Sequence, residues 1–212
     1  MKALKAVPGK AASPLTAKQL EILEVASGYF LDHGYQGTSI NVMAREAGIS
    51  KESIYRYFSS KLDLFEAVIA RELADYKKKL QFLDVQPDSL GLEAALVWAA
   101  ESILAVVGSK RTLALRRLVF REAEQSPQIG EYYYEIGPQM AYLYLEKIFR
   151  RHREGARLEA TKLARNFVAL LLHCEMLKLD CSVATPMSQA QLSAHADKVS
   201  REFLSIYYDQ VG

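Results

Sequence analysis

Two short segments with helical spacing of apolar residues, 39–46 and 50–57, are joined by an Ala-Gly-Ile turn centred on Gly48. Gly48 can take the positive φ that a tight turn between helices requires. Helices this short are not stable alone, so a third helix must hold them in place. Segment 16–33 is the obvious candidate, because it has a continuous apolar face and is followed by Gly34 as a stop signal. The sequence therefore predicts a helix-turn-helix within a three-helix bundle.

The rest of the chain also has helical spacing and almost no sign of strands. It contains no sustained period-two run bounded by turn residues, and no Asn-Gly or Asp-Gly hairpin. Pro138 is expected to split or kink the segment in which it lies. The further helices predicted by apolar periodicity are 60–81, 89–107, 111–125, 128–151, 159–181 and 188–208. The breaks between helices fall at Gly48, Pro87, Gly108, Pro127, Gly155 and Pro186. The predicted fold class is all-α.

Length and composition are those of an ordinary soluble protein with one or two domains. The 212 residues carry a net charge of only +2, which argues neither for nor against a nucleic-acid partner. Residues 1–61 contain eight Lys or Arg and five Asp or Glu, a small local excess of +3. No apolar stretch is long enough for a signal peptide or a membrane span, so we expect a cytoplasmic protein without a membrane partner.

The exposed face of segment 50–57 combines basic, hydroxyl and aromatic side chains. Solubility alone does not require two tyrosines beside Lys and Arg on such a helix. Phenol and Ser hydroxyls donate to phosphate oxygens, and Lys or Arg reads guanine edges. The helix start at Ser50 also offers free N–H groups and a positive dipole end to the DNA backbone. The residues of this face are Lys51, Glu52, Ser53, Tyr55, Arg56 and Tyr57. Together they indicate DNA binding.

The run from Thr16 to Phe65 resembles the DNA-binding domain of the TetR family of bacterial transcriptional regulators. The shared pattern is a helix ending in Phe-x-x-x-Gly, then Thr-Ser-Ile, Ala-x-x-Ala-Gly-Ile-Ser and Tyr-x-Tyr-Phe-x-x-Lys. The resemblance implies a regulator that binds double-stranded operator DNA, and most such relatives repress. The full set of candidate DNA-binding residues is Thr38, Ser39, Ser50, Lys51, Glu52, Ser53, Tyr55, Arg56, Tyr57 and Lys61.

The resemblance also implies a role for each of these side chains. Thr38 would cap the first helix of the motif and touch phosphate. Lys51 and Glu52 would face the bases, whereas the side chains that would hold the DNA backbone are Ser53, Tyr55, Tyr57 and Lys61. Glu52 departs from the small residue common in the family: it either accepts a hydrogen bond from a cytosine amino group or repels wrong sequences. Whether Arg56 reaches bases or phosphates is left open.

These observations predict that the chain is divided into three parts. Residues 1–14 are predicted to be a disordered basic arm, either a solvated tail or a segment that reaches DNA. Residues 15–62 form the predicted DNA-binding domain, with its motif at 39–58. Residues 63–212 form the predicted helical regulatory and dimerisation domain, in which the resemblance is looser.

Homodimerisation is expected because one recognition helix reads too few bases for useful specificity. Two-fold pairing would place the recognition helices about 34–36 Å apart on a pseudo-palindromic operator. The resemblance puts the interface on segments 159–181 and 188–208, although an intrachain helical hairpin would show the same pattern. The candidate interface residues are Leu163, Leu170, Cys174, Leu192, Val199 and Phe203.

The resemblance also implies a ligand pocket inside the middle helices. We expect a small, largely apolar or aromatic effector that shifts segment 60–81 and releases the operator. The candidate pocket residues are Trp98, Phe120, Tyr133, Met140, Tyr144, Phe167 and Met176, with His173 and Glu175 as polar anchors. An alternative is that most of the apolar ones are plain core.

Several other functions lack support in the sequence. No Gly-rich phosphate loop, nucleophile elbow, His-Glu-x-x-His or Cys-x-x-Cys motif occurs, so we expect neither an enzyme nor a cofactor. His173, Cys174 and Glu175 are adjacent and point in different helical directions, which disfavours a metal site. Cys174 and Cys181 lie two helical turns apart, roughly 10 Å, too far for a disulfide. Buried reduced thiols are expected, with a redox-sensing pair as the alternative. A DNA-binding or partner-binding module without ligand control remains a rival to the effector hypothesis.

Overall fold

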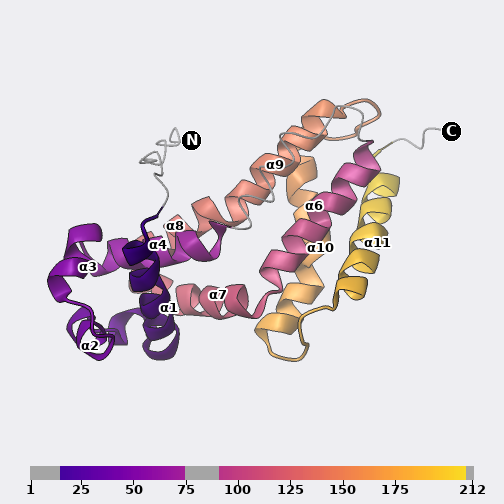
Figure 1. Ribbon diagram of the computed structural model, residues 1–212. Coiled ribbons are helices and arrows are strands. Elements are labelled where there is room, and N and C mark those ends of the chain that lie inside the picture. The colour runs from indigo at the N-terminus through magenta and orange to yellow at the C-terminus, as the bar shows by residue number, and fades with distance from the viewer. Residues whose placement is uncertain (1–14, 75–90, 209–212) are drawn as a thin grey trace. The chain divides into compact units, whose positions relative to one another are not determined.

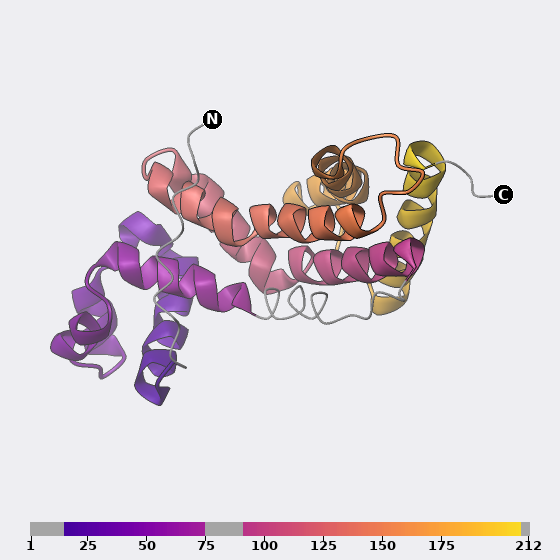
Figure 2. The same cartoon turned by 90° about the horizontal axis from the view of Figure 1, so that it is seen from above.

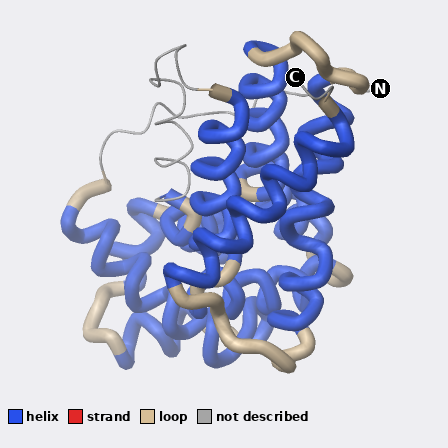
Figure 3. The backbone as a smooth tube through the Cα atoms, turned by 90° about the vertical axis from the view of Figure 1, so that its right-hand side faces the viewer, coloured by secondary structure: helices blue, strands red, loops and turns tan. Residues whose placement is uncertain are grey.

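The computed structural model describes residues 15–74 and 91–208 (Figure 1). These residues form helices and the turns between them, with no strand among them beyond an isolated bridge between Ala156 and Tyr208 (Figure 3). The all-α prediction is therefore confirmed. The predicted arm 1–14, the break at Pro87 and segments 75–81 and 89–90 lie outside the described residues.

The chain divides into two compact units, one ending at Val68 and the other beginning at Ile69. The first unit contains α1 (Ala17–Gly37), α2 (Ile40–Glu46), α3 (Lys51–Tyr57) and most of α4 (Lys61–Glu72). The helices of the second unit are α6 (Leu92–Val107), α7 (Lys110–Ala123), α8 (Pro127–Ile136), α9 (Pro138–Arg151), α10 (Ala160–Asp180) and α11 (Gln189–Tyr207).

Polar side chains at the helix starts set the boundaries of the first unit. Thr16 and Gln19 form a reciprocal capping box at the start of α1, and Ser50 accepts a hydrogen bond from the backbone N–H of Ser53 at the start of α3. The predicted stop at Gly34 is confirmed, because this residue leaves the helical conformation with φ 76°. One further turn follows before α1 ends at Gly37.

The turn between α2 and α3 requires glycine. Gly48 has φ +67°, and the next N–H, that of Ile49, donates back to the carbonyl of Ala44 at 2.9 Å. This arrangement is the Schellman motif, in which a left-handed residue ends a helix and turns the chain sharply. It fixes the angle at which α3 leaves α2.

Replacing Gly48 by Ala should lower the free energy of unfolding by about 1–2 kcal/mol, because left-handed backbone is unfavourable for an L-residue. A new Cβ would meet nothing within 4 Å, so the cost is conformational rather than steric. Gly28 lies inside α1 with equally open space, and Gly28→Ala should raise the free energy of unfolding by about 0.5–1 kcal/mol. Urea unfolding of both variants checks the pair, and shifts in the same direction would contradict the assignment.

The core of the second unit is built by α6, α9, α10 and α11, which lie side by side in two views (Figures 1 and 2). α11 packs mainly on α6, and α10 packs mainly on α9. Phe149, Phe167 and Phe203 meet at its centre, with the Phe167 and Phe203 rings 5.1 Å apart and edge to face. Each of these three rings is fully buried, so this aromatic cluster excludes water from the helix bundle.

Segment 128–151 is divided, as Pro138 predicts. α8 ends at Ile136, Gly137 adopts φ −111° and ψ −94°, and Pro138 occupies the first turn of α9. A proline fits there because the first-turn N–H needs no helical partner. The break lets α8 pack on α7 while α9 enters the bundle core.

Two other findings concern the surface. Both thiols are free and exposed, so the expectation of buried cysteines is wrong for Cys174 and Cys181. Cys174 is exposed although it lies on the same side of α10 as Phe167 and Leu171, and it borders a groove that α10 and α11 line. Within the described ranges no single helix is long and apolar enough to cross a membrane, and α6 with α7 meets that test only as a pair bent by 68°.

Candidate functional site

The helix-turn-helix separates its anchors from a polar face. Ile49, Ile54 and Phe58 are buried, which holds α3 against the first unit. Lys51 and Tyr55 are exposed on the other side of the same two-turn helix. The remaining candidates on α3 follow this division, with Glu52 and Arg56 exposed and Ser53 and Tyr57 half-buried. The local structure thus leaves one face of α3 exposed, while the opposite face holds the helix to the first unit.

Aromatic rings hold the basic side chains of this face in place. The Lys51 ammonium lies 5.7 Å from the centroid of the Tyr55 ring, and the Arg56 guanidinium lies 5.0 Å from that of Tyr57. Arg56 Nη2 also donates to Ser53 Oγ at 3.5 Å. Cation–π contacts at exposed sites are worth about 0.5–1 kcal/mol each. They restrict the rotamers of two long side chains before a ligand arrives.

The capping role that the resemblance implies for Thr38 is taken by Ser39. Ser39, not Thr38, caps α2, because its side chain accepts from the N–H of Val42 at 3.5 Å. Thr38 is 3% exposed, and its hydroxyl donates to the carbonyl of Gly34 at 2.7 Å. The prediction that Thr38 caps the helix is therefore wrong. The β-branched residue instead satisfies a carbonyl that the kink in α1 leaves without a helical partner.

Lys61 points toward the protein rather than away from it. Its Nζ donates to the carbonyl of Thr38 at 3.1 Å and lies 4.6 Å from the centroid of the Tyr35 ring. This lysine, at the start of α4, therefore ties α4 to the segment between α1 and α2. A role on the DNA backbone stays a prediction, and it would require the ammonium to serve phosphate and carbonyl together.

A brace between α1 and α2 was missed by sequence reasoning. The Tyr29 hydroxyl donates a short hydrogen bond to the Glu46 carboxylate. This bond is the main reason that the pKa of Tyr29 is raised, with burial second. The sequence contains only a weak signal for this contact, since the half-buried Tyr29 in α1 and Glu46 in α2 are 17 residues apart. The brace keeps α2, and with it the turn to α3, at a defined angle to α1.

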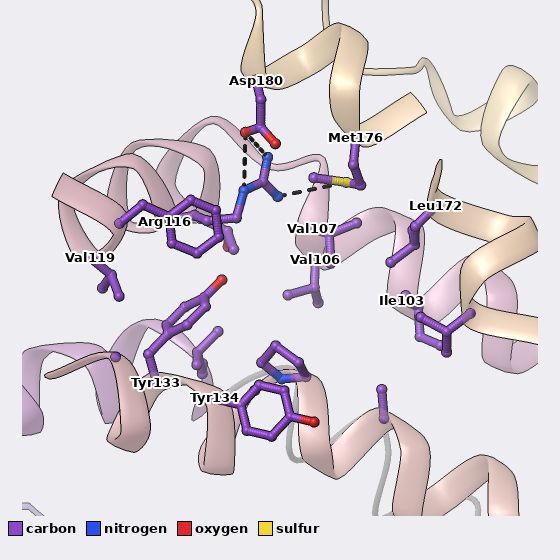
Figure 4. Close-up of a pocket in the computed structure, with 18 of the residues that line it drawn as sticks. Ile103, Val106, Val107, Arg116, Val119, Tyr133, Tyr134, Leu172, Met176 and Asp180 are labelled. Carbon is purple, nitrogen blue, oxygen red and sulfur yellow. Dashed lines mark hydrogen bonds and ion pairs between the residues drawn. The ribbon is translucent and has the colours of Figure 1, made fainter. Parts of the chain in front are cut away.

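The second unit contains a cavity of about 520 Å³ between α6, α7, α8, α9 and α10 (Figure 4). This volume lies within the range of small-molecule sites. Leu73, just after α4, also lines it. Most of the lining is apolar, and the residues that Figure 4 labels are Ile103, Val106, Val107, Arg116, Val119, Tyr133, Tyr134, Leu172, Met176 and Asp180.

The structure brings together only part of the predicted pocket. Phe120, Tyr133 and Met176 line the cavity, in agreement with the expectation. Tyr144 and Phe167 do not line it, because they are buried in the helix bundle core, as the alternative of a plain core predicted. The other candidates outside the lining are Trp98 and Met140, packed against the same core, and His173 and Glu175, which border a groove on α10.

An ion pair between a buried arginine and a partly exposed aspartate forms one wall of the cavity. The side chain of Arg116 on α7 is 8% exposed, and its Nε donates to Oδ1 of Asp180, the last residue of α10, at 3.2 Å. The neighbouring Arg117 donates to the carbonyl of Leu179 at 2.7 Å and to Ser182 Oγ at 3.0 Å. Two consecutive arginines therefore hold the C-terminal end of α10, where cations are favoured by the helix dipole.

Sequence reasoning missed this polar pair, although a signal existed. Arg116 interrupts the apolar stripe of α7, four residues after Thr112 and three before Val119. Asp180 extends the stripe of α10 that contains Leu172 and Met176 at intervals of four. A charged residue at an inward position needs a partner. Only the packing of α7 on α10 shows which partner each one has.

The predicted dimer residues divide into two groups. Leu163, Leu192, Val199 and Phe203 are at most 5% exposed and belong to the core of their own unit. They cannot face a second copy, so the assignment of these four to an interface is corrected to an intrachain one. Leu170 and Cys174 lie on the outer groove between α10 and α11.

No metal centre can be assigned in the described part of the chain, where no three His, Cys, Asp or Glu side chains gather around a common point. His173 Nδ1 and Cys174 Sγ are 3.7 Å apart.

Comparison with known families covers both units. A family model described as "Bacterial regulatory proteins, tetR family" matches residues 22–68. A second one, described as "AefR-like transcriptional repressor, C-terminal domain", matches residues 94–209, more than half of the chain. Both describe regulators of transcription rather than enzymes.

Three individual proteins that match this chain are between 24% and 38% identical to it. The transcriptional activator FasR of Mycolicibacterium smegmatis is 38% identical over 60 residues, which are 28% of this chain and 27% of FasR. The chain thus spans about a quarter of the length of this relative. The nucleoid occlusion factor SlmA of Haemophilus ducreyi is 24% identical over 76% of this chain and 80% of its own. The solved structure of a TetR-family regulator from Mesorhizobium loti is 26% identical, with a TM-score of 0.77, and covers 91% of this chain and 97% of the other.

Proposed function

Because this chain belongs to the TetR family of bacterial transcriptional regulators, we propose that it is a repressor that a small, largely apolar or aromatic molecule releases from its operator. The cavity of the second unit carries this proposal, since a regulator without an effector has no use for such a volume lined by apolar side chains. The description of the C-terminal family model supports repression, whereas FasR is named as an activator. Whether the protein represses or activates transcription must therefore be measured separately.

In the proposed complex, α3 enters the major groove. Lys51 and Glu52 face the bases, because they occupy the exposed first turn of the helix. Tyr55, Tyr57 and Ser53 donate to phosphates on either side, and Arg56, in the last turn of α3, contacts either a base or a phosphate. The hydroxyl of Ser39, as a donor, and the N–H groups beside Ser50 complete the contacts at the two helix starts.

Homodimerisation through the outer face of α10 and α11 is part of the proposal. This face carries Leu170 and Cys174 together with Leu177, which is 60% exposed, and Ile206, which is 45% exposed. Large apolar side chains grouped on two adjacent helices are typical of an interface. A four-helix bundle of two copies would bury them and present two α3 helices to a pseudo-palindromic operator.

The route from effector to DNA runs through α4. Leu73 lines the cavity immediately after this helix, and the nearby Glu72 forms an ion pair with Arg111 on α7. The other end of α4 starts at Lys61, which holds the segment before α2. An effector that displaces Leu73 would therefore act on a helix that continues into the DNA-binding unit. A coupling of about 1–3 kcal/mol between the two sites is the usual magnitude.

Selecting binding sites from a randomised duplex pool at fixed salt tests whether the protein binds a specific DNA sequence. We expect an enriched inverted repeat that is lost in the Lys51→Ala/Tyr55→Ala double variant. A reporter gene placed behind that repeat then gives the sign of regulation. If a folded dimeric protein enriches no sequence even at low salt, sequence-specific binding is wrong.

The proposed binding of the effector in the cavity is tested with a variant whose cavity is filled. Leu172→Trp fills the cavity from α10, and Leu143→Trp places the same ring at an exposed position of α9 outside it. A compound that releases the operator should lose its effect on the first variant by at least tenfold in concentration and keep it on the second. Equal responses of the two variants would place the effector elsewhere.

A second candidate function is a DNA-binding architectural factor without ligand control. The match to the nucleoid occlusion factor SlmA over three quarters of the chain favours it. Such a protein would bind the same inverted repeat but show no ligand-dependent change in melting temperature. A thermal-shift screen of small aromatic compounds therefore separates the two functions.

A further inference from the structure

The two charged side chains that line the cavity lie at one corner of it, whereas the hydroxyl of Tyr134 points away from that corner (Figure 4). Arg116 from α7, Asp180 from α10 and Tyr133 from α8 converge there (Figure 4). Towards α6 and the middle of α10 the labelled lining is apolar, with Ile103 and Leu172 among it. A ligand whose polar end lay at this corner would extend an apolar body towards Ile103 and Leu172.

The Arg116 guanidinium has hydrogen-bonding capacity left over. Its Nε and Nη2 both donate to the same oxygen, Oδ1 of Asp180. Its Nη1 contacts only the Met176 sulfur at 3.6 Å, and a thioether is a weak acceptor. Among the described residues no oxygen accepts from Nη1. The side chain is almost fully buried and lines the cavity, so an acceptor oxygen of a bound ligand would satisfy the remaining N–H groups.

The Tyr133 hydroxyl offers a second donor. Its side chain is 8% exposed, and the hydroxyl points into the cavity (Figure 4). No described residue forms a hydrogen bond with this hydroxyl. Burial raises the pKa of Tyr133, with the nearby Asp180 carboxylate adding to the rise and Arg116 opposing it. The phenol is therefore protonated at neutral pH and available as a donor.

The charge of the corner is already balanced. Asp180 neutralises Arg116, so an anionic ligand would bring an uncompensated negative charge next to a carboxylate in an apolar site. A neutral acceptor oxygen avoids this cost and still uses both donors. Building on the proposed effector site, we infer that the effector is an aromatic carbonyl compound, a ketone or an ester, whose uncharged oxygen accepts from Tyr133 and from Arg116 Nη1.

Three naphthalenes of similar size test this inference by isothermal titration calorimetry on the full chain. 2-Acetylnaphthalene carries the neutral carbonyl, 2-ethylnaphthalene has nearly the same shape without an acceptor, and 2-naphthoate carries a carboxylate. We expect the ketone to bind about tenfold more tightly than the ethyl compound, as one buried hydrogen bond gives. The carboxylate should bind more weakly than the ketone.

Two tyrosine variants locate the effect. Tyr133→Phe removes only the buried hydroxyl, and Tyr132→Phe removes the hydroxyl of the preceding residue of α8, which is outside the cavity lining. The first should abolish most of the tenfold preference for the ketone and leave the affinity for 2-ethylnaphthalene unchanged, whereas the second should change neither. Thermal melting of both variants shows that they are folded.

The outcomes separate this inference from the effector function itself. Equal binding of the ketone and the ethyl compound, or tightest binding of the carboxylate, overturns the carbonyl assignment while an effector cavity stands. A ketone preference that survives in Tyr133→Phe also overturns it, because the acceptor then lies elsewhere. If none of the three compounds binds or raises the melting temperature, the inference and the proposed effector function fall together.

Discussion

Replacing Phe30 by Ala is expected to unfold the DNA-binding unit and abolish DNA binding while the helix bundle of the second unit stays folded. Phe30 is fully buried, and its ring lies 4.7 Å from that of Phe65, edge to face. Truncation of a buried Phe costs about 3–5 kcal/mol, from lost transfer free energy and the cavity left behind. A unit of this size has little stability to lose. Amide hydrogen exchange resolved by segment is the measurement, combined with gel shifts on the selected operator.

Leu20→Ala is the matched control for this prediction. Leu20 lies on the same helix but is 43% exposed, so its truncation should change the free energy of unfolding by less than about 1 kcal/mol. Exchange should accelerate only in α1 to α4 of the Phe30 variant and in neither unit of the control. Operator affinity within twofold of the parent for Phe30→Ala would show that this ring does not hold the motif together.

The Lys51→Ala/Tyr55→Ala double variant should weaken operator binding by at least a hundredfold without unfolding the protein. Both side chains are exposed, so their removal leaves no cavity and breaks only their mutual cation–π contact. A direct base or phosphate contact is worth about 1–3 kcal/mol, and a dimer loses each contact twice. Fluorescence anisotropy with the selected duplex, at several salt concentrations, measures the effect.

Lys18→Ala is the control for the charge that this variant removes. Lys18 is a basic residue of α1 that pairs with Glu21 at 2.9 Å and lies outside the motif. The Lys18→Ala variant should have nearly unchanged operator affinity and an unchanged dependence of that affinity on salt. Loss of a lysine that contacts phosphate, by contrast, lowers the salt dependence of binding. An affinity loss in the double variant no greater than in Lys18→Ala would remove α3 from the interface.

Helix positions followed from local chemistry that the sequence displays directly. Ser50 before the apolar run of α3, Gly34 after that of α1 and Pro138 inside 128–151 each act on the few backbone groups next to them. Such effects do not depend on distant residues, so most predicted boundaries agree with the structure to within a few residues. The exception is the predicted helix 60–81, because α4 ends at Glu72. The left-handed turn at Gly48 belongs to the same class of local effects.

Which face of a helix meets which neighbour could not be predicted in this way. α10 carries apolar residues around most of its circumference, so its pattern allowed Leu163 to face a partner chain, the bundle core or a cavity. The structure buries Leu163 and Phe167 in the core, turns Leu172 and Met176 toward the cavity, and leaves Leu177 exposed. Periodicity identifies an apolar position but not the helix that covers it.

The fold class, the helix-turn-helix and the family were thus determined by the sequence alone, because capping, turn geometry and the spacing of the motif are local properties of neighbouring residues. The cavity and its polar corner were decided only by the tertiary structure. Tyr133, Arg116 and Asp180 come from three helices, with Arg116 and Asp180 separated by 64 positions in the chain. Their convergence depends on how α7, α8 and α10 pack, and that packing is a balance of many weak long-range contacts that no single segment encodes.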